Sequence, residues 1–324
     1  SAASDVYKRQ VLAKEAGLEL GIKESIVVND RMETSVPDIY AAGDAVQVKH
    51  YVTGNDALIS LAGPANKHGR IIADNICGGD SRYLGSQGSS VIKVFDMTAA
   101  TTGINETNAK KSGLEVDTVI LSPMSHAGYY PGGKVMTMKV VFEKETYRLL
   151  GAQIIGYEGV DKRIDVLATV IHAGLKATQL KDLDLAYAPP YSSAKDPVNM
   201  AGFMIDNIAK GTLKQWHLED MDKISRDKSV VLLDVRTVGE FNRGHMDGFK
   251  NIPVDELRER INEIEKGKPV YLICQSGLRS YIASRILEGN GYETYNFSGG
   301  FRFYDAVVND RALIEKAYAC GMDY

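Results

Sequence analysis

The chain has 324 residues, of which 44% are hydrophobic and 25% are charged, and its formal net charge is −4 at pH 7. This composition is typical of a globular protein with room for two or three domains, and it argues against a nucleic-acid partner. No apolar run approaches the roughly 20 residues that cross a bilayer, so we expect no membrane contact. Three cysteines are too few for a disulfide framework in a chain of this length, which favours the reducing cytoplasm.

The opening of the chain reads as part of an α/β domain. Residues 1–10 have no start methionine and no periodicity, so we interpret them as a scar or assembly artefact. Residues 11–90 then alternate between helical and extended patterns. The predicted elements are a short helix over 12–20, strands over 26–28 and 39–42, and a helix over 61–77. The first helix would have nothing to pack against, so we expect that an N-terminal portion is missing.

The middle of the chain, residues 91–200, predicts a small α+β domain. The predicted elements are strands over 91–95, 116–121, 135–142 and 149–157 and helices over 105–112 and 161–173, the first capped by Asn105 and ended by Gly113. Three prolines oppose regular structure over 186–199. A helix is expected over 200–211, and we interpret residues 201–216 as a linker.

The last part, residues 217–324, predicts a compact α/β domain with a parallel sheet, because strands and helices alternate. The predicted elements are helices beginning near Leu218 and over 254–265 and 280–288, and strands over 230–235, 270–273 and 294–297.

Cys274 carries the strongest chemical signal. It directly follows the apolar run 270–273 and precedes a loop with a glycine, after which Arg279 opens a helix. Such a loop gathers backbone N–H groups and a helix N-terminus around one sulfur, which stabilises a thiolate or persulfide anion. The alternative is an inert, buried core cysteine, as most free cysteines are.

The surroundings of Cys274 resemble the rhodanese (sulfurtransferase) domain. The resemblance rests on six islands in the same order: Asp234–Arg236, Glu240–Phe241, Gly244–His245, Asn251–Pro253, Cys274–Arg279 and Gly299–Gly300. It implies that Cys274 is the nucleophile that holds sulfur as a persulfide and that Arg279 adds positive charge. The loop residues that would bind the substrate are Gln275, Ser276, Gly277 and Leu278. The six-residue loop has the length of sulfur transfer rather than the longer loop of the related phosphatases.

Other residues of this domain receive structural interpretations. Asp234, at the end of its strand, is expected to anchor neighbouring loops. We interpret Arg236 as a salt-bridge partner of Glu240, the alternative being a substrate contact. His245 is expected to be structural rather than catalytic, and Cys77 to fill the core at the end of its helix. No pair of cysteines has metal-ligand spacing, so no metal is expected.

The segment 34–45 carries a second signal, because a strand there would deliver Gly43 and Asp44 to its carboxyl end. An ionised carboxylate at that place can accept a hydrogen bond from a sugar-like hydroxyl; the alternative is a turn with an N-cap aspartate. The segment resembles the second FAD-binding motif of the pyridine-nucleotide disulfide oxidoreductases, which implies that Asp44 binds the ribityl chain of FAD. The FAD contacts that it implies are Thr34, Pro37, Asp38, Ile39, Gly43, Asp44, Ala45, Pro64 and Tyr187.

Two further patches, 125–132 and 186–199, resemble coenzyme A-disulfide reductase and its NADH-dependent persulfide-reductase relatives. Several of those proteins carry a C-terminal rhodanese domain. The resemblance implies that Tyr129 and Tyr187 reach the active site of a partner subunit, that Lys195 contacts coenzyme A and that Asn66 lies by the substrate. Residues 91–200 would be the dimerisation domain of a homodimer. The alternatives are tyrosines that pack an interface and a solvated Lys195–Asp196 pair.

The chain also departs from that family. It has no Gly-x-Gly-x-x-Gly for the ADP part of FAD or for NAD(P)H, and no redox cysteine facing the flavin. Residues 11–90 would be a partial FAD/NAD(P)-binding domain, and the chain about the C-terminal 60% of its parent.

We therefore expect a truncated FAD-dependent NAD(P)H reductase of coenzyme A disulfide or persulfide, fused to a rhodanese domain that also accepts other sulfane-sulfur donors. The alternative is a stand-alone sulfurtransferase, or a sulfur-carrying dimeric binding module, with a vestigial FAD site.

Overall fold

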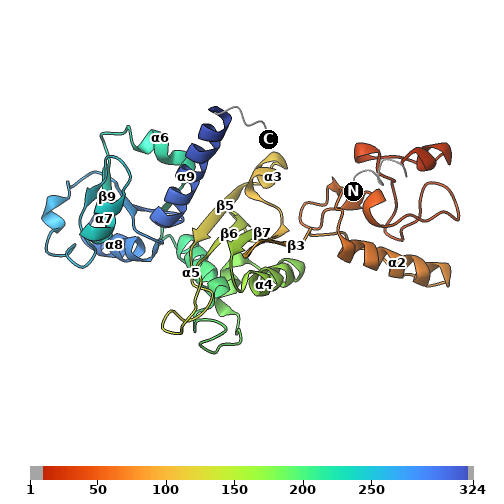
Figure 1. Ribbon diagram of the computed structural model, residues 1–324, viewed down its shortest axis with the longest axis horizontal. Coiled ribbons are helices and arrows are strands. Elements are labelled where there is room, and N and C mark those ends of the chain that lie inside the picture. The colour runs from red at the N-terminus through yellow and green to blue at the C-terminus, as the bar shows by residue number, and fades with distance from the viewer. Residues whose placement is uncertain (1–9, 320–324) are drawn as a thin grey trace.

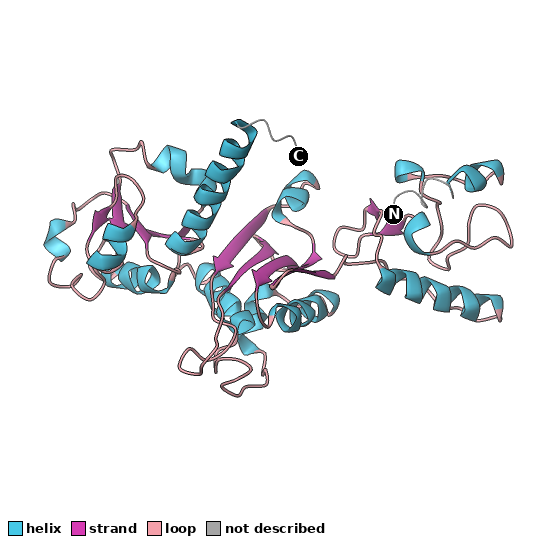
Figure 2. Cartoon of the chain, in the orientation of Figure 1, coloured by secondary structure: helices cyan, strands magenta, loops and turns pink. Residues whose placement is uncertain are grey.

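The computed structural model describes residues 10–319. Three units follow one another along the chain: a small N-terminal unit, a central unit around an antiparallel sheet and a C-terminal unit around a parallel sheet (Figure 1). The secondary structure is mixed throughout (Figure 2), which confirms the predicted α/β class with an α+β middle. The segment 1–10, interpreted above as a scar, lies outside the described residues except for residue 10.

The N-terminal unit packs one long helix beside irregular loops. After a helical segment over residues 10–15, its elements are η1 (Ile22–Glu24), η2 (Gly43–Ala45), β1 (Val48–Lys49), β2 (Asp56–Ala57) and α2 (Ala62–Ile76). The helix predicted over 61–77 is confirmed. The strands predicted over 26–28 and 39–42 are wrong: only single bridges form there, at Ile26 and Tyr40, because no neighbouring strand runs beside these segments. Cys77 is exposed, so it does not fill the core as expected.

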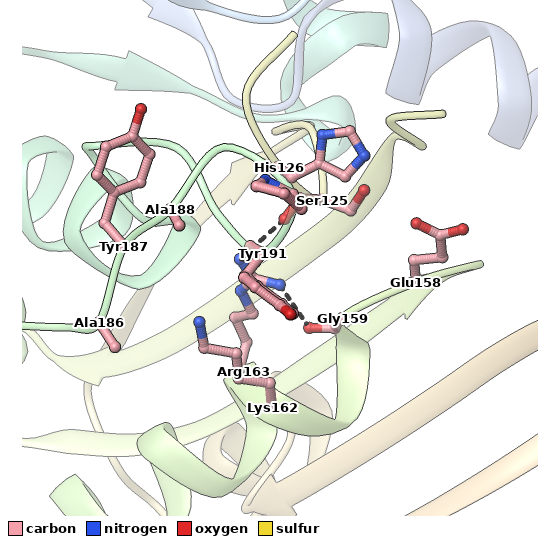
Figure 3. Close-up of a pocket in the computed structure, with 11 residues that line it drawn as sticks. Ser125, His126, Glu158, Gly159, Lys162, Arg163, Ala186, Tyr187, Ala188 and Tyr191 are labelled. Atoms are coloured by element: carbon pink, nitrogen blue, oxygen red, sulfur yellow. Dashed lines mark hydrogen bonds between the residues drawn. The ribbon is translucent and has the colours of Figure 1, made fainter. Parts of the chain in front are cut away.

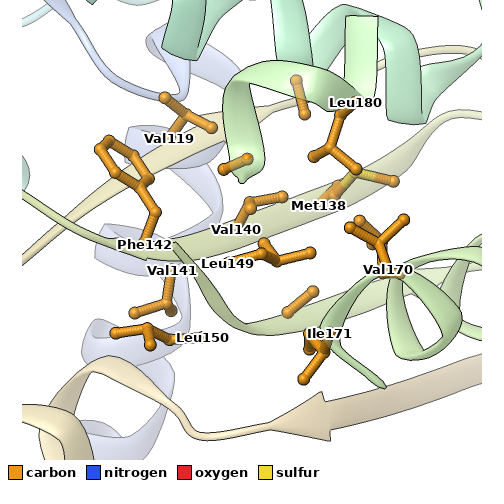
Figure 4. Close-up of a cluster of buried hydrophobic side chains, with 14 of the residues drawn as sticks. Val119, Met138, Val140, Val141, Phe142, Leu149, Leu150, Val170, Ile171 and Leu180 are labelled. Atoms are coloured by element: carbon orange, nitrogen blue, oxygen red, sulfur yellow. The ribbon is translucent and has the colours of Figure 1, made fainter. Parts of the chain in front are cut away.

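In the central unit, helices cover one side of a five-stranded antiparallel sheet. Its strands, in the order β3-β4-β7-β6-β5, are β3 (Ser90–Val94), β4 (Met97–Gly103), β7 (Leu149–Gly156), β6 (Met136–Glu143) and β5 (Val116–Leu121). Its helices are α3 (Glu106–Lys111), α4 (Val160–His172), η3 (Ala177–Asp182) and α5 (Pro197–Ala209). The core between sheet and helices (Figure 4) includes Val140, Leu150 and Leu180, all fully buried. This continuous apolar contact between the sheet and the helices fixes the position of the loops that extend from the sheet.

Two features of the central unit were not predicted. Strand β4 pairs with both β3 and β7, although its small and polar residues give a weak strand signal. Helix α5 begins at Pro197, three residues before the expected start, because the carboxylate of Asp196 accepts the N–H of Val198 and a proline is well tolerated in the first turn.

The C-terminal unit contains the expected parallel sheet. Its strands, in the order β10-β9-β11-β12-β8, are β10 (Lys250–Asn251), β9 (Val231–Asp234), β11 (Val270–Ile273), β12 (Thr294–Phe297) and β8 (Gln215–Trp216). Its helices are η4 (Leu218–Asp220), α6 (Met221–Ile224), α7 (Val238–Arg243), η5 (Ile261–Glu263), α8 (Leu278–Glu288) and α9 (Gly300–Ala319). Helices α7 and α9 had not been predicted, and the segment expected as a linker contains β8.

The helix predicted over 254–265 is wrong. Leu257 and Ile264 are buried at helix-like spacing, but the chain reaches this burial through successive turns and the short η5. The N–H of Leu257 donates to the carbonyl of Val254, and the N–H of Ile264 donates to the carbonyl of Ile261, three residues back in each case. Turns of this kind place side chains on one face at nearly the same interval as an α-helix, so the apolar pattern could not separate the two.

The edge of the central sheet is joined to the C-terminal unit. The N–H of Ile120 in edge strand β5 donates to the buried hydroxyl of Ser298 at 3.0 Å, and the side-chain amide of Gln215 donates to the carbonyl of Thr118 at 3.2 Å. Edge strands expose unpaired backbone groups, and these side chains satisfy two of them. The two units are therefore connected by direct hydrogen bonds as well as by the chain.

Within residues 10–319, no helix combines the length and the apolar character that crossing a bilayer requires.

Candidate functional site

Cys274 lies immediately after β11, with its sulfur at the N-terminus of α8. Its side chain is 1% exposed, and its Sγ accepts the N–H of Gly277 at 3.1 Å and the hydroxyl of Ser280 at 3.2 Å. Gly277 has a φ of +97°, a conformation that allows the chain to turn directly into α8. The sulfur thus faces two hydrogen-bond donors and the positive end of a helix, an arrangement suited to an anion.

The start of α9 holds the Cys274 loop from behind. The N–H groups of Phe301 and Arg302 donate to the carbonyls of Cys274 and Gln275, at 2.8 and 3.2 Å. A Cβ on Gly300 would lie 2.7 Å from the carbonyl oxygen of Gln275, so only glycine permits this approach. The glycine pair noted in the sequence therefore fixes the backbone of the sulfur loop.

Arg279 forms a two-pronged salt bridge with Glu240, at 2.7 Å for each pair of atoms. This hydrogen bonding from Arg279, together with hydrogen bonds from Thr237, lowers the pKa of Glu240 to about 2. The positive charge expected from Arg279 is therefore largely compensated by its partner. A direct contact of Arg279 with substrate stays a prediction.

The expected pair of Arg236 with Glu240 does not form. Arg236 pairs with Asp234 instead. The closest atoms are 2.7 Å apart and the two side chains are at most 1% exposed. The pairing is local because the two residues are separated by one position, and the Asp234 carboxylate also accepts the backbone N–H of Arg236. The Asp234 carboxylate thus holds Arg236, whose guanidinium donates to the carbonyl of Gly244 at 2.7 Å, so the anchoring expected of Asp234 is exerted through Arg236. His245 stacks on Phe241 with ring centroids 3.9 Å apart, in keeping with its structural interpretation.

A cavity of about 410 Å³ lies against the sulfur loop. Its lining residues are Arg236, Glu240, Arg243, Gly244, Gln275, Phe301, Arg302 and Asp305. Sequence reasoning missed Arg243 and Arg302, because they belong to helices α7 and α9, which had not been predicted. Gln275, the residue that follows Cys274, lines this cavity, so a ligand has room against the sulfur loop.

The segment proposed for FAD forms a compact turn against α2 rather than the end of a strand. Thr34 donates its hydroxyl to the carbonyl of Ile39 at 2.9 Å, and Gly43 donates its N–H to Nδ1 of His68 at 3.2 Å. His68 lies on α2 with 1% exposure, and burial lowers its pKa, so its ring stays neutral and can accept this bond. His68 was not singled out from the sequence, in which only its spacing from Gly43 could have indicated that the two residues interact.

The residues around Gly43 fit part of the expected cofactor. Asp44 is not an N-cap, since the cap position of η2 is Ala42, and no hydrogen bond or ion pair engages the Asp44 carboxylate among the described residues. It can therefore accept a hydroxyl hydrogen. The first turn of α2, which contains Pro64, has no side-chain cap and leaves backbone donors near this turn. Pro37 and Asp38 lie in the preceding loop, so the proposed FAD residues of the N-terminal unit form one region, whereas Tyr187 lies beside Tyr129 in the central unit.

The structure brings Tyr129 and Tyr187 together, although 58 positions separate them. Their phenolic oxygens lie 2.7 Å apart, and the hydrogen bond to Tyr129 raises the pKa of Tyr187. Lys195 is exposed and lies over the ring of Phe203, 5.4 Å from its centroid. Asn66 is exposed on α2 of the N-terminal unit and makes no hydrogen bond with these groups among the described residues.

Arg163 holds the two tyrosine loops in place (Figure 3). Its guanidinium donates to the carbonyl of Ser125 in the Tyr129 loop at 2.9 Å, and to Asp196 at the end of the Tyr187 loop at 2.9 Å. A cavity of about 450 Å³, lined by both loops and by α4, opens here. Asp196 is buried with Arg163, so the alternative of a solvated Lys195–Asp196 pair is wrong.

Three family profiles match the chain. "Pyridine nucleotide-disulphide oxidoreductase" matches residues 6–69, the dimerisation domain of the same proteins matches residues 89–197, and "Rhodanese-like domain" matches residues 217–306. The pyridine nucleotide-disulphide oxidoreductases depend on FAD and NAD(P)H, which confirms the cofactors expected for the family.

Individual proteins match as well. The NAD(P)H sulfur oxidoreductase (CoA-dependent) of Pyrococcus furiosus is 40% identical over 60% of this chain and 44% of its own length. The crystal structure of reduced Bacillus anthracis CoADR-RHD covers 93% of this chain and 54% of its own, with 47% identity and a TM-score of 0.89. The NAD-dependent persulfide reductase from A. fulgidus covers 91% of this chain and 54% of its own, with 41% identity and a TM-score of 0.83.

The chain thus spans about half the length of the proteins that it matches. Both solved structures cover more than nine tenths of this chain, so the likeness reaches into all three units. The chain is thus similar to coenzyme A disulfide reductases and persulfide reductases, and its successive parts match the profiles of the pyridine nucleotide-disulphide oxidoreductases and of the rhodanese-like domain.

Proposed function

We propose that this chain is part of an FAD-dependent NAD(P)H reductase of coenzyme A disulfide or persulfide, and that its rhodanese domain transfers sulfane sulfur through Cys274. The observation that carries the transfer is the environment of one atom. Sγ of Cys274 accepts two hydrogen bonds at the N-terminus of α8, and the next residue, Gln275, lines a cavity. A cysteine that only fills an apolar core needs no hydrogen-bond donors at its sulfur, because it packs there as a small, unreactive apolar side chain.

The proposed transfer involves no net oxidation. The Cys274 thiolate attacks the outer sulfur of a donor such as thiosulfate, the S–S bond of the donor breaks, and sulfite leaves with the electron pair. The resulting persulfide on Cys274 then passes its terminal sulfur to a thiol or to cyanide, and the thiolate returns. Gly277 and Ser280 stabilise the negative sulfur before and after each step.

The test is the rate of sulfur transfer from thiosulfate to cyanide. Cys274→Ser is expected to abolish it, whereas Cys77→Ser, which removes an exposed cysteine of the N-terminal unit, is expected to leave it unchanged. Equal rates for Cys274→Ser and the parent would refute the role of Cys274.

The reductase activity of the whole protein rests on the central and N-terminal units. When bound, the cofactor supplies the electron pair that cleaves a disulfide or persulfide. Asp44 would accept a hydroxyl hydrogen of FAD, and Tyr129 and Tyr187 would hold a proton beside the leaving sulfur of a partner subunit. The raised pKa of Tyr187 supports this role, because the phenol keeps its proton. Lys195 and Asn66 are proposed to contact coenzyme A or its persulfide.

A homodimer is the assembly that we propose for this chain. The match of the dimerisation profile over residues 89–197 supports it, and so do the exposed rings of Tyr129 and Tyr191. Light scattering of the purified protein tests it, and a mass of one chain at all concentrations would contradict it. We place the protein in the cytoplasm, where Cys274 would remain reduced.

The alternative function is sulfur transfer or sulfur carriage without a working flavin site. One observation favours it: every group described around Cys274 comes from the C-terminal unit. Titration with FAD separates the two. Binding with a shifted flavin spectrum, lost in Asp44→Ala, supports the reductase, and no binding supports the alternative.

A further inference from the structure

The hydroxyl of Ser280 has two acceptors within reach. Its Oγ lies 3.2 Å from Sγ of Cys274 and 3.1 Å from the carbonyl oxygen of Gly277, and the whole side chain is buried. A hydroxyl group carries one proton to donate, so the two acceptors compete for it. The hydrogen bond from Ser280 to the sulfur therefore depends on what else satisfies the carbonyl of Gly277.

Two other donors reach the carbonyl of Gly277. The backbone N–H of Tyr281 donates to it at 3.1 Å, as the first bond of α8, and Nδ2 of Asn296 donates to it at 3.1 Å from β12. A carbonyl oxygen has two lone pairs, so these two donors fill its capacity. The hydroxyl of Ser280 is then left for Sγ of Cys274.

Asn296 is a buried amide that the fold uses sparingly. Its side chain is 3% exposed, and the bond to Gly277 is the one hydrogen bond that it makes within residues 10–319. Its Oδ1 is buried without a partner in the same part of the chain. An unpaired buried amide oxygen costs stability, whereas an apolar side chain of similar size would carry no such cost. The amide is therefore better explained by what it does for the sulfur loop than by its contribution to folding.

We propose that Asn296 is a positioning residue for sulfur transfer: by satisfying the carbonyl of Gly277, it keeps the hydroxyl of Ser280 on Sγ of Cys274. Without the amide, the hydroxyl turns to the carbonyl and the sulfur loses this donor. The thiolate is then less stable and forms only at higher pH. The inference rests on the proposed transfer through Cys274 and adds a residue that acts through Ser280.

The test is the pH profile of kcat/KM for thiosulfate, which reports the ionisation of the free enzyme. The variants are Asn296→Leu, which keeps most of the side-chain volume, and Asn296→Ala, and neither can donate a hydrogen bond. Thr294→Val is the matched control. Thr294 is also buried, lies on the same face of β12, and donates its hydroxyl to Glu288 at the other end of α8, at 2.8 Å.

The acidic midpoint of the profile is expected to move up by about one pH unit in both Asn296 variants, the effect of losing one hydrogen bond to a charged group. It is expected to stay unchanged in Thr294→Val. In a Ser280→Ala background, which has already lost the hydroxyl, Asn296→Leu should move the midpoint no further. A full additional shift in that background, or an unchanged midpoint in either Asn296 single variant, would overturn the inference.

Failure of this inference can be told apart from failure of the proposed function. Transfer by Cys274→Ser at the parent rate contradicts the function itself. Transfer that requires Cys274, together with Asn296 variants that behave like Thr294→Val, contradicts the positioning role alone.

Fluorescence of the buried Trp216 shows whether each variant is folded. If the Asn296 variants unfold, hydrogen exchange of the Asn296 Nδ2 protons in the parent protein gives the answer. Protection of these protons supports the bond to Gly277, and exchange as fast as that of the exposed Asn66 side chain contradicts it.

Discussion

The guanidinium of Arg163 and the carboxylate of Asp196 form a salt bridge of 2.9 Å in which neither side chain is more than 3% exposed. The pair joins α4 to the N-terminus of α5, and it fixes the loops that carry Tyr129 and Tyr187. A buried charge is tolerated because each partner compensates the other.

Replacing Arg163 with Met is therefore expected to destabilise the protein by about 3–5 kcal/mol, because it leaves the Asp196 carboxylate buried without a partner. Denaturant unfolding followed by circular dichroism measures the loss. The double variant Arg163→Met/Asp196→Asn should recover part of the stability. Equal destabilisation in the single and double variants would show that packing, rather than charge, accounts for the effect.

Acid should weaken the bridge between Glu240 and Arg279 only at very low pH. The pKa of Glu240 is about 2 in the folded chain against an ordinary value of 4.5. A lowered carboxyl pKa contributes stability that is complete above pH 4.5 and is lost as the pH falls through about 2. The stability difference between the parent and Glu240→Gln should therefore shrink over this window.

Trp216 offers the readout for that experiment. It is the one tryptophan of the chain, and it is buried in the C-terminal unit, 4.4 Å in ring-centroid distance from Phe297. Its fluorescence reports the unfolding of this unit. A difference that stays constant from pH 6 to pH 2 would contradict the prediction.

Ser280→Ala removes one of the two donors to the sulfur of Cys274. We expect the rate of sulfur transfer from thiosulfate to fall about tenfold, the effect of losing one hydrogen bond to a charged group. Ser284→Ala is the matched control, since Ser284 lies one turn further along α8, is also buried and bonds only to the carbonyl of Tyr281. Equal rates for the two variants would leave Ser280 without a role.

His68→Leu should release the turn at Gly43. The N–H of Gly43 loses its acceptor, so its hydrogen exchange is expected to accelerate about tenfold or more. Asn66→Ala, an exposed change on the same helix, should leave the exchange unchanged. Fast exchange of Gly43 in the parent protein would contradict the hydrogen bond on which the prediction rests.

Elements defined by local signals could be predicted from the sequence. The helix over 105–112 was expected from its cap and its terminal glycine, and it is found as α3 with Asn105 as the cap. Strand β11 has the bounds predicted for it, because a short apolar run between turns is nearly sufficient for a buried strand. The sulfur loop was likewise visible, since its residues are consecutive.

Features decided by distant contacts could not be predicted. The choice of Asp234 rather than Glu240 as the partner of Arg236 depends on where α7 and α8 place Glu240 and Arg279. Likewise, Arg163 and His68 act on segments more than 20 positions away, through hydrogen bonds that only the folded chain creates. Their roles follow from geometry that residue spacing does not encode.

The hydrogen bond from Ile120 to Ser298 limits how sulfur can travel. Ser298 lies two residues before Gly300, which touches the sulfur loop, so the loop and the central sheet are anchored through the same short segment. Cys274 is thus held in a fixed position relative to the central sheet and does not lie on a mobile arm. In the proposed function, sulfur bound at this thiol would therefore leave on a small diffusing carrier, and its exchange with the proposed reductase site would depend on the concentration of that carrier.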